Sequence, residues 1–178
     1  MKNVSTFHSL GSGLLVLLML FVLSPSWAAE DDRAAADVSI VPLSDLSADL
    51  ARVAATGKPL MLIFSAEHCF YCERLKENIV KPMLRSGDYE DRVIIRVTEI
   101  DDYGTIKGKK GEPIDPPDLA RTYDVRVTPT VLILGPDGTE VAPRQLGINN
   151  EDYYGAYLDE AIDQGYATIH GKPVSASR

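Results

Sequence analysis

An unbroken apolar run that leads into a pair of cysteines is the feature that most limits the fold of this chain. Residues 60–64 are all apolar, and turn residues bound them. A run of this length is typical of a central parallel strand that helices cover on both faces. Cys69 and Cys72, the only two cysteines, follow where the strand should give way to a helix. The pattern therefore predicts an α/β domain with two thiols at a strand-to-helix turn.

Other patterns along the chain supply the remaining elements of this α/β fold. Helices are expected at 45–55, 69–82, 115–123 and 151–164, and strands at 93–100, 130–134 and 140–146. Ser44 is the expected N-cap of the first helix, and Pro82 should end or kink the second. Pro143 should place the last strand at the edge of the sheet. We expect a three-layer sandwich with a central mixed sheet of about four strands flanked by helices.

Two of these helices carry apolar residues at helical spacing, so each should bury one face. The buried faces are expected to hold Leu46, Leu50, Val53 and Ala54 in the first helix, and Tyr154, Tyr157, Leu158, Ala161 and Ile162 in the last. Residues 101–115 are rich in glycine, lysine and proline and are expected to form a loop. Its lysines (Lys107, Lys109 and Lys110) either contact a partner protein or remain solvated.

The first 28 residues have the organisation of a secretory signal peptide. Lys2 precedes an apolar run at 14–23, and the small residues of a cleavage site end at Ala28. The run is shorter than the roughly 20 residues that span a bilayer core, although an uncleaved anchor is the alternative. We expect 1–28 to be the signal peptide, 29–42 a flexible leader, 43–170 the folded domain and 171–178 a polar tail. The mature protein would be periplasmic or secreted.

The acidic composition excludes one class of partner. The formal net charge of −8 becomes −9 when the signal peptide, with its single lysine, is removed. Proteins that bind nucleic acid draw most of their affinity from lysine and arginine contacts with phosphates. We therefore expect no nucleic-acid binding.

The spacing of Cys69 and Cys72 favours reversible chemistry over a structural role. A disulfide between them would close a loop of about four residues and stabilise the fold by only about 2 kcal/mol. A cysteine at a helix start lies near unpaired N–H groups and the positive end of the helix dipole, which favour the thiolate. We therefore expect Cys69 to be the attacking thiolate and Cys72 the resolving thiol. A protonated His68 would add positive charge beside the nucleophile.

Two segments of the chain resemble the thioredoxin-like superfamily. Residues 66–72 (AEHCFYC), placed after an apolar strand, are similar to the thioredoxin active-site segment, and residues 123–130 (YDVRVTPT) to the cis-proline region. The resemblance covers about residues 43–165 and implies a thioredoxin fold. It also implies that Pro129 is cis and packs against the cysteines, and that Thr128 pairs with an extended substrate segment. The expected substrate-binding residues are Thr128, Pro129 and His68.

The resemblance implies an exported thiol:disulfide oxidoreductase that acts on protein disulfides. We expect this enzyme to need no cofactor or metal, to work as a monomer and to take electrons from a membrane donor of the thiol-transfer type. Phe70-Tyr71 stands where cytosolic thioredoxins have Gly-Pro. The buried acid of thioredoxin falls on Ile63, so the proton of Cys72 must leave through another base or through water. Glu67 and Glu73 are near in sequence but are expected to be solvated.

Two other functions compete with this interpretation. A copper chaperone of the same fold could use His68, Cys69 and Cys72 as ligands, but His170 is the only other histidine after residue 28 and no fourth ligand has suitable spacing. The second competing function is a binding protein of the same fold whose cysteines no longer have a redox role. Covalent haem attachment is excluded because Glu73 stands where that motif needs histidine.

Overall fold

The computed structural model describes residues 38–172, which form an α/β fold. No helix in this part of the chain combines the length and apolar character of a membrane span. In chain order the elements are α1 (Leu46–Thr56), β1 (Leu60–Ser65), α2 (Phe70–Leu75), the π-helix η2 (Lys76–Val80), α3 (Lys81–Ser86), β2 (Ile94–Glu99), β3 (Ile106–Lys107), β4 (Pro113–Ile114), α4 (Pro116–Thr122), β5 (Thr130–Leu134), β6 (Gln145–Leu146) and α5 (Glu151–Ile169).

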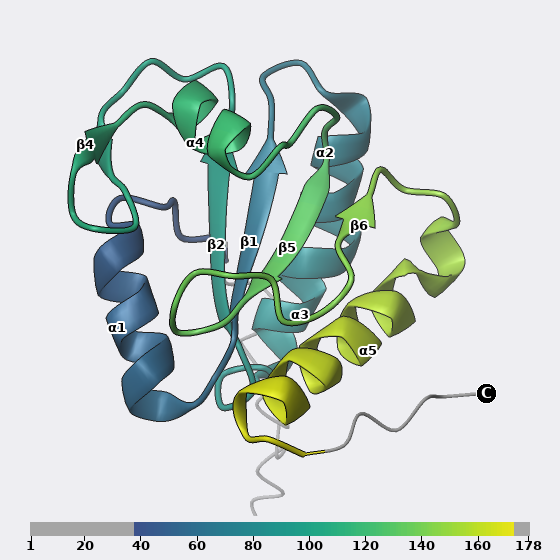
Figure 1. Cartoon of the computed structure of the whole chain (residues 1–178). Helices are drawn as coiled ribbons and strands as arrows, with labels where there is room; N and C mark the ends of the chain where they lie inside the picture. Colours follow the sequence, from purple (N-terminus) through teal and green to yellow (C-terminus); the bar gives the residue numbers. More distant parts are fainter. Residues whose placement is uncertain (1–37, 173–178) are drawn as a thin grey trace, which may run out of the picture. The chain divides into compact units, whose positions relative to one another are not determined.

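The central sheet is mixed, with the strand order β2-β1-β5-β6. β1 is parallel to β2 and antiparallel to β5, which in turn pairs antiparallel with β6. Figure 1 shows the sheet between two helical layers, with α1 and α4 on one side and α2, α3 and α5 on the other. The expected three-layer sandwich with about four central strands is therefore confirmed.

Every residue of β1 is buried, because the strand lies in the middle of the sheet and packs on both sides. Successive side chains of a strand point to opposite faces. Met61 and Ile63 accordingly belong to the core under α2 and α5, while Leu62 and Phe64 belong to the core under α1 and α4. This central position sets where the turn after β1, and the cysteines on it, emerge from the sheet.

Pro82 does not end the second helix. Helical structure continues from α2 through η2 into α3, where Pro82 occupies the first turn. A proline inside an α-helix has no N–H to donate, and its ring collides with the carbonyl four residues earlier. The wider turn of η2 immediately before it moves the backbone away from the ring, so the chain remains helical.

Several expected boundaries are corrected by the structure. The N-cap of α1 is Asp45, not Ser44: its carboxylate accepts hydrogen bonds from Ser47 Oγ and Ala48 N–H. These two bonds and Lys107 lower the pKa of Asp45 to about 2. α5 continues to Ile169, five residues beyond its expected end.

The strand pattern near the end of the sheet differs as well. Of the strand expected at 140–146, only β6 (Gln145–Leu146) forms, and Glu140 makes an isolated bridge to Leu134. The expected loop at 101–115 contains the small hairpin β3–β4. A two-residue strand carries too short a pattern to be seen in a sequence.

Two residues expected in buried helix faces are exposed. Ala54 lies at the outer edge of the α1 stripe, and Tyr157 projects into solvent from α5. The other members of both stripes are buried as expected. Asp49 of α1 is buried as well, and it pairs with Arg96 of β2.

A short segment before α1 covers the outer edge of β2. Val97 N–H donates to the carbonyl of Val41 at 3.2 Å, and Leu43 N–H donates to the carbonyl of Val97 at 2.8 Å. Ile40 is buried in the core under α2 and α5. Residues 40–43 therefore pack against the folded domain, whereas residues 1–37 and 173–178, with the expected signal peptide, lie outside the described part.

Gly165 of α5 marks the closest approach of that helix to the sheet. A Cβ at this position would lie 2.5 Å from Ile133 Cγ2 and 3.2 Å from Val141 Cγ2. Gly165→Ala is therefore expected to lower the free energy of unfolding by about 1–3 kcal/mol through overpacking. Urea denaturation provides the measurement.

Gly155, in the same helix, is the matched control for this prediction. A Cβ at Gly155 would meet no atom within 4 Å. Gly155→Ala should therefore stabilise the protein by about 0.5–1 kcal/mol through helix propensity. If both substitutions changed the free energy of unfolding in the same direction, the close approach at Gly165 would be contradicted.

Candidate active site

The two cysteines occupy the turn between β1 and α2 and are joined by a disulfide bond. Their Cα atoms are 5.2 Å apart, within the usual range for a disulfide. Cys69 is the N-cap of α2 and is half-buried, whereas Cys72 lies in the first helical turn and is 1% exposed. A partner molecule can therefore reach Cys69 and not Cys72.

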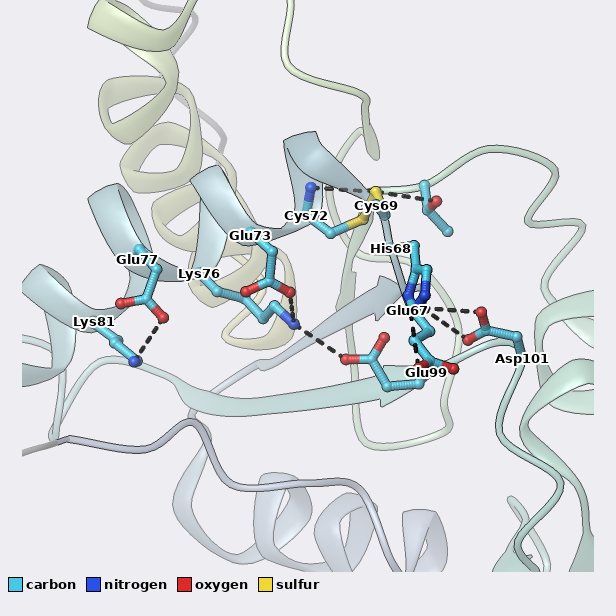
Figure 2. Close-up of polar contacts among 11 residues, drawn as sticks. Glu67, His68, Cys69, Cys72, Glu73, Lys76, Glu77, Lys81, Glu99 and Asp101 are labelled. Atoms are coloured by element: carbon cyan, nitrogen blue, oxygen red, sulfur yellow. Dashed lines mark hydrogen bonds and ion pairs between the residues drawn. A yellow bond between two sulfur atoms is a disulfide. The ribbon is translucent and has the colours of Figure 1, made fainter.

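Hydrogen-bond donors converge on the sulfur of Cys69. Cys72 N–H donates to Cys69 Sγ at 3.2 Å (Figure 2), and Thr128 Oγ1 donates to the same sulfur at 3.5 Å. Donors at a helix start, together with the positive end of the helix dipole, favour a sulfur anion over a neutral thiol. The surroundings of Cys69 therefore suit a thiolate in the reduced protein.

Thr128 and Pro129 reach the cysteines from a distant part of the chain. The Thr128–Pro129 peptide bond is cis in the structure, and β5 begins at the next residue. The carbonyl of Pro129 accepts a hydrogen bond of 2.8 Å from Gly147 N–H, which ties the segment to the end of β6. Fifty-nine positions separate Thr128 from Cys69, yet pairing between β1 and β5 brings the two together.

His68 stands in solvent beside Glu67. Its side chain is 86% exposed, and its Nδ1 lies 3.6 Å from Glu67 Oε1. The backbone of His68 has a positive φ of 60°, which turns the chain just before the helix. Figure 2 shows the ring directed toward Glu67, and the structure records no contact between it and the sulfur of Cys69.

Four apolar residues, here called the apolar rim, lie on the segments that carry the site: Phe70 and Tyr71 between the cysteines, Val127 next to Thr128, and Leu146 paired with Thr130. All four side chains are exposed, and the rings of Phe70 and Tyr71 meet edge to face. Exposed apolar side chains gathered in one place indicate a surface for binding other molecules. Sequence reasoning missed Val127 and Leu146 as members of this surface, because only the pairing of β6 with β5 brings Leu146 to it.

A cavity of about 560 Å³ opens next to the cysteine turn and is lined mostly by charged residues. On one side Lys76 Nζ lies 2.7 Å from Glu73 Oε1 and 3.3 Å from Glu99 Oε1 (Figure 2). Burial acts to lower the pKa of Lys76, but the hydrogen bonds and charges of Glu73 and Glu99 outweigh it and raise the pKa above its ordinary value. Glu99 comes from β2, so no local sequence pattern connects it with the cysteines.

The structure offers no support for the copper-binding alternative. His170 stacks on Tyr166 at the C-terminal end of α5, with 3.9 Å between the ring centroids. Between residues 38 and 172, no group of three or more histidine, cysteine, aspartate or glutamate side chains is arranged to hold a metal ion. No fourth ligand joins His68, Cys69 and Cys72 in this part of the chain.

Comparison with known proteins agrees with the fold and the cysteine turn. Residues 46–162 match the family described as the thioredoxin-like domain. A thioredoxin from Thermus thermophilus is 24% identical, with a TM-score of 0.53 over 72% of this chain and 92% of its own. The DsbH oxidoreductase is 12% identical, with a TM-score of 0.54 over 71% of this chain and 87% of its own. No curated protein matches the chain.

Both solved structures share the fold of this chain. The family match extends from the first residue of α1 into α5 and contains the cysteine turn and the cis Thr128–Pro129 bond. The chain therefore belongs to the thioredoxin-like domain family.

Proposed function

We propose that this protein is an exported thiol:disulfide oxidoreductase that reduces or exchanges disulfides of other proteins through Cys69 and Cys72. One observation carries the proposal: an accessible sulfur at a helix start is bonded to a buried one. The accessible sulfur can meet a substrate, and the buried one is held where it can reach only its neighbour. Reversible exchange needs both properties.

The two cysteines would act in sequence. In the reduced protein, the Cys69 thiolate attacks a substrate disulfide, and one substrate sulfur leaves as a thiolate. Cys72 then attacks Cys69 Sγ, which forms the Cys69–Cys72 disulfide and releases the second substrate thiolate. The substrate gains two electrons, and the protein loses two.

Thr128 and Pro129 would position the substrate. Thr128 already contacts the sulfur of Cys69, so an extended peptide beside it would bring its own disulfide to the same point. The apolar rim would cover the flanking side chains of the substrate. His68, exposed at the edge of the turn, would contact the substrate rather than Cys69.

Export and the electron source belong to the same proposal. The charged, apolar and small-residue sections of 1–28 support cleavage near Ala28 and release into the periplasm or medium. A membrane protein of the thiol-transfer type would return two electrons to the disulfide, and the protein would act as a monomer. Titration of the cysteine pair against glutathione would give its reduction potential and hence the direction of transfer.

A trapping experiment tests the proposal. Cys72→Ala removes the resolving thiol, so the mixed disulfide on Cys69 should accumulate. When the reduced Cys72→Ala protein is mixed with a protein substrate that contains a disulfide, we expect a covalent adduct on a non-reducing gel, and dithiothreitol should cleave it. The double variant Cys69→Ala/Cys72→Ala should give none, and an empty trap with the single variant would refute the exchange mechanism.

A further inference from the structure

Two buried oxygen atoms without hydrogen-bond partners lie at the ends of neighbouring strands. Within residues 38–172, neither Ser65 Oγ nor Glu99 Oε2 has a hydrogen-bond partner. The side chain of Ser65 is fully buried, and the register pairs Ser65 with Glu99 across β1 and β2. A buried polar atom that lacks a partner destabilises the fold. Two of them at one cross-strand position therefore indicate a function.

Both side chains point to the face of the sheet that α2 covers. Ile63 and Val97 belong to the core under α2 and α5, and side chains two residues apart in a strand share a face. Ser65 and Glu99 are the next residues on that face. The ion pair between Lys76, which follows α2 in the same helical run, and Glu99 Oε1 at 3.3 Å agrees with this placement.

Cys72 lies on the inner side of the same helix, over the same end of the sheet. A helix that connects two parallel strands runs back antiparallel to them, so its first turn covers the end of the first strand. Cys72 is in that first turn, and Ser65 ends β1. Lys76 follows Cys72 by four residues and therefore lies on the same side of the helix. Figure 2 shows its ion pair with Glu99 next to the turn that carries the disulfide.

We propose that Ser65 and Glu99 take the proton from Cys72 when this thiol resolves the mixed disulfide. This inference rests on the proposed function. Ile63, where the resemblance to thioredoxin would place a buried acid, carries no proton acceptor, and Glu99 on the neighbouring strand supplies one.

The proton path has defined steps. In the structure, which is the disulfide form, Ser65 Oγ makes no hydrogen bond to Cys72 or to Glu99. In the mixed disulfide, where Cys72 carries a free S–H, the Ser65 hydroxyl would accept that proton and pass its own proton to the Glu99 carboxylate. The Cys72 thiolate then forms a bond to Cys69 Sγ, the bond from Cys69 to the substrate sulfur breaks, and that sulfur leaves with the electron pair. Glu99 returns the proton to solvent or to the leaving thiolate through the charged cavity.

Other charged groups face the path from each element around it. Lys76 holds the Glu99 carboxylate and is itself held by Glu73 from the solvent side. The remaining ionisable side chains of the cavity come from the turns after β1 and β2 and are Glu67, His68, Asp101, Asp102 and Tyr103. Glu73 shares Lys76 with Glu99 but lies outside the buried path, which makes it a matched control.

The experiment separates the two steps of exchange. The reduced full chain is mixed with dithiobis(nitrobenzoate): the first release of thionitrobenzoate reports attack by Cys69, and the second reports resolution by Cys72. In Glu99→Gln, the second release should slow about 10²-fold at pH 7, while the first stays unchanged. The deficit should shrink as the pH rises, because hydroxide then competes with Glu99 as the acceptor of the proton. Glu73→Gln should keep the wild-type rates.

Ser65→Ala supplies an independent readout. Removal of an unpartnered buried hydroxyl should raise the melting temperature and yet slow the second release. In the double variant Ser65→Ala/Glu99→Gln, the second release should be no slower than in Glu99→Gln alone, because both residues serve one path. A wild-type second release in either single variant, or a deficit equal at every pH, would overturn the inference. Absence of the first release in the wild type would instead refute the proposed function.

Discussion

Cys69→Ser is expected to lower the turnover of a protein disulfide by more than about 10³-fold, because it removes the nucleophile that forms the covalent intermediate. Serine is similar in size and can still accept the hydrogen bond that Cys72 N–H donates to residue 69, so the start of α2 keeps its cap. Its hydroxyl neither ionises like a thiol nor forms a disulfide. Steady-state reduction of a protein disulfide, with dithiothreitol as electron donor, measures the effect.

Reduced wild-type protein is the structural control for this variant, since it also lacks the disulfide. The loop closed by Cys69 and Cys72 is so short that the bond should contribute only about 2 kcal/mol to stability. Because both proteins lack the disulfide, Cys69→Ser should unfold at the same urea concentration as the reduced wild type. Turnover close to wild type in a folded Cys69→Ser protein would show that another group attacks the substrate.

Asp49→Ala is expected to lower the free energy of unfolding by about 3–5 kcal/mol, because it leaves the largely buried guanidinium of Arg96 without its carboxylate partner. The two side chains are 8% and 13% exposed. Arg96 donates from Nε to Asp49 Oδ2 at 2.8 Å and from Nη2 to Oδ1 at 2.7 Å, which is a bidentate pair between α1 and β2. Urea denaturation at neutral pH measures the loss.

Arg52 is the matched control, since it contacts the same carboxylate from outside. Its Nη1 lies 3.6 Å from Asp49 Oδ1, and its side chain is 62% exposed. Arg52→Ala should change stability by no more than about 0.5 kcal/mol. The double variant Asp49→Leu/Arg96→Met should recover most of the loss, because no charge remains buried. Equal effects of Asp49→Ala and Arg52→Ala would contradict a buried pair.

Predictions that depended on short-range pattern agreed best with the structure. The apolar run at 60–64 is the buried strand β1, and Cys69 stands at the start of α2 as its N-cap. The ends of helices are harder to predict, because several residues near a helix end can each act as its cap. Asp45 caps α1 in place of its neighbour Ser44, since its carboxylate receives both local donors and also pairs with Lys107 of β3.

The errors share one physical origin, which is competition from contacts distant in the chain. Ala54 lies at the edge of the apolar stripe of α1 and is exposed, whereas the charged residue Asp49 is buried because it pairs with Arg96. Pro82 lies within continuous helical structure, directly after the wider turn of η2. Neither outcome can be read from hydrophobic spacing, which describes one element at a time.

The order of apolar and polar residues by itself determined the α/β class, the buried strand and the pair of cysteines one helical turn apart, because these depend on neighbours within a single element. Only the tertiary structure decided what surrounds the sulfurs. Strand pairing brings Thr128 to Cys69, and the register of β1 with β2 puts Glu99 beside Ser65. Such contacts depend on the packing of the whole sheet and its helices, and the spacing of residues along the chain does not encode them.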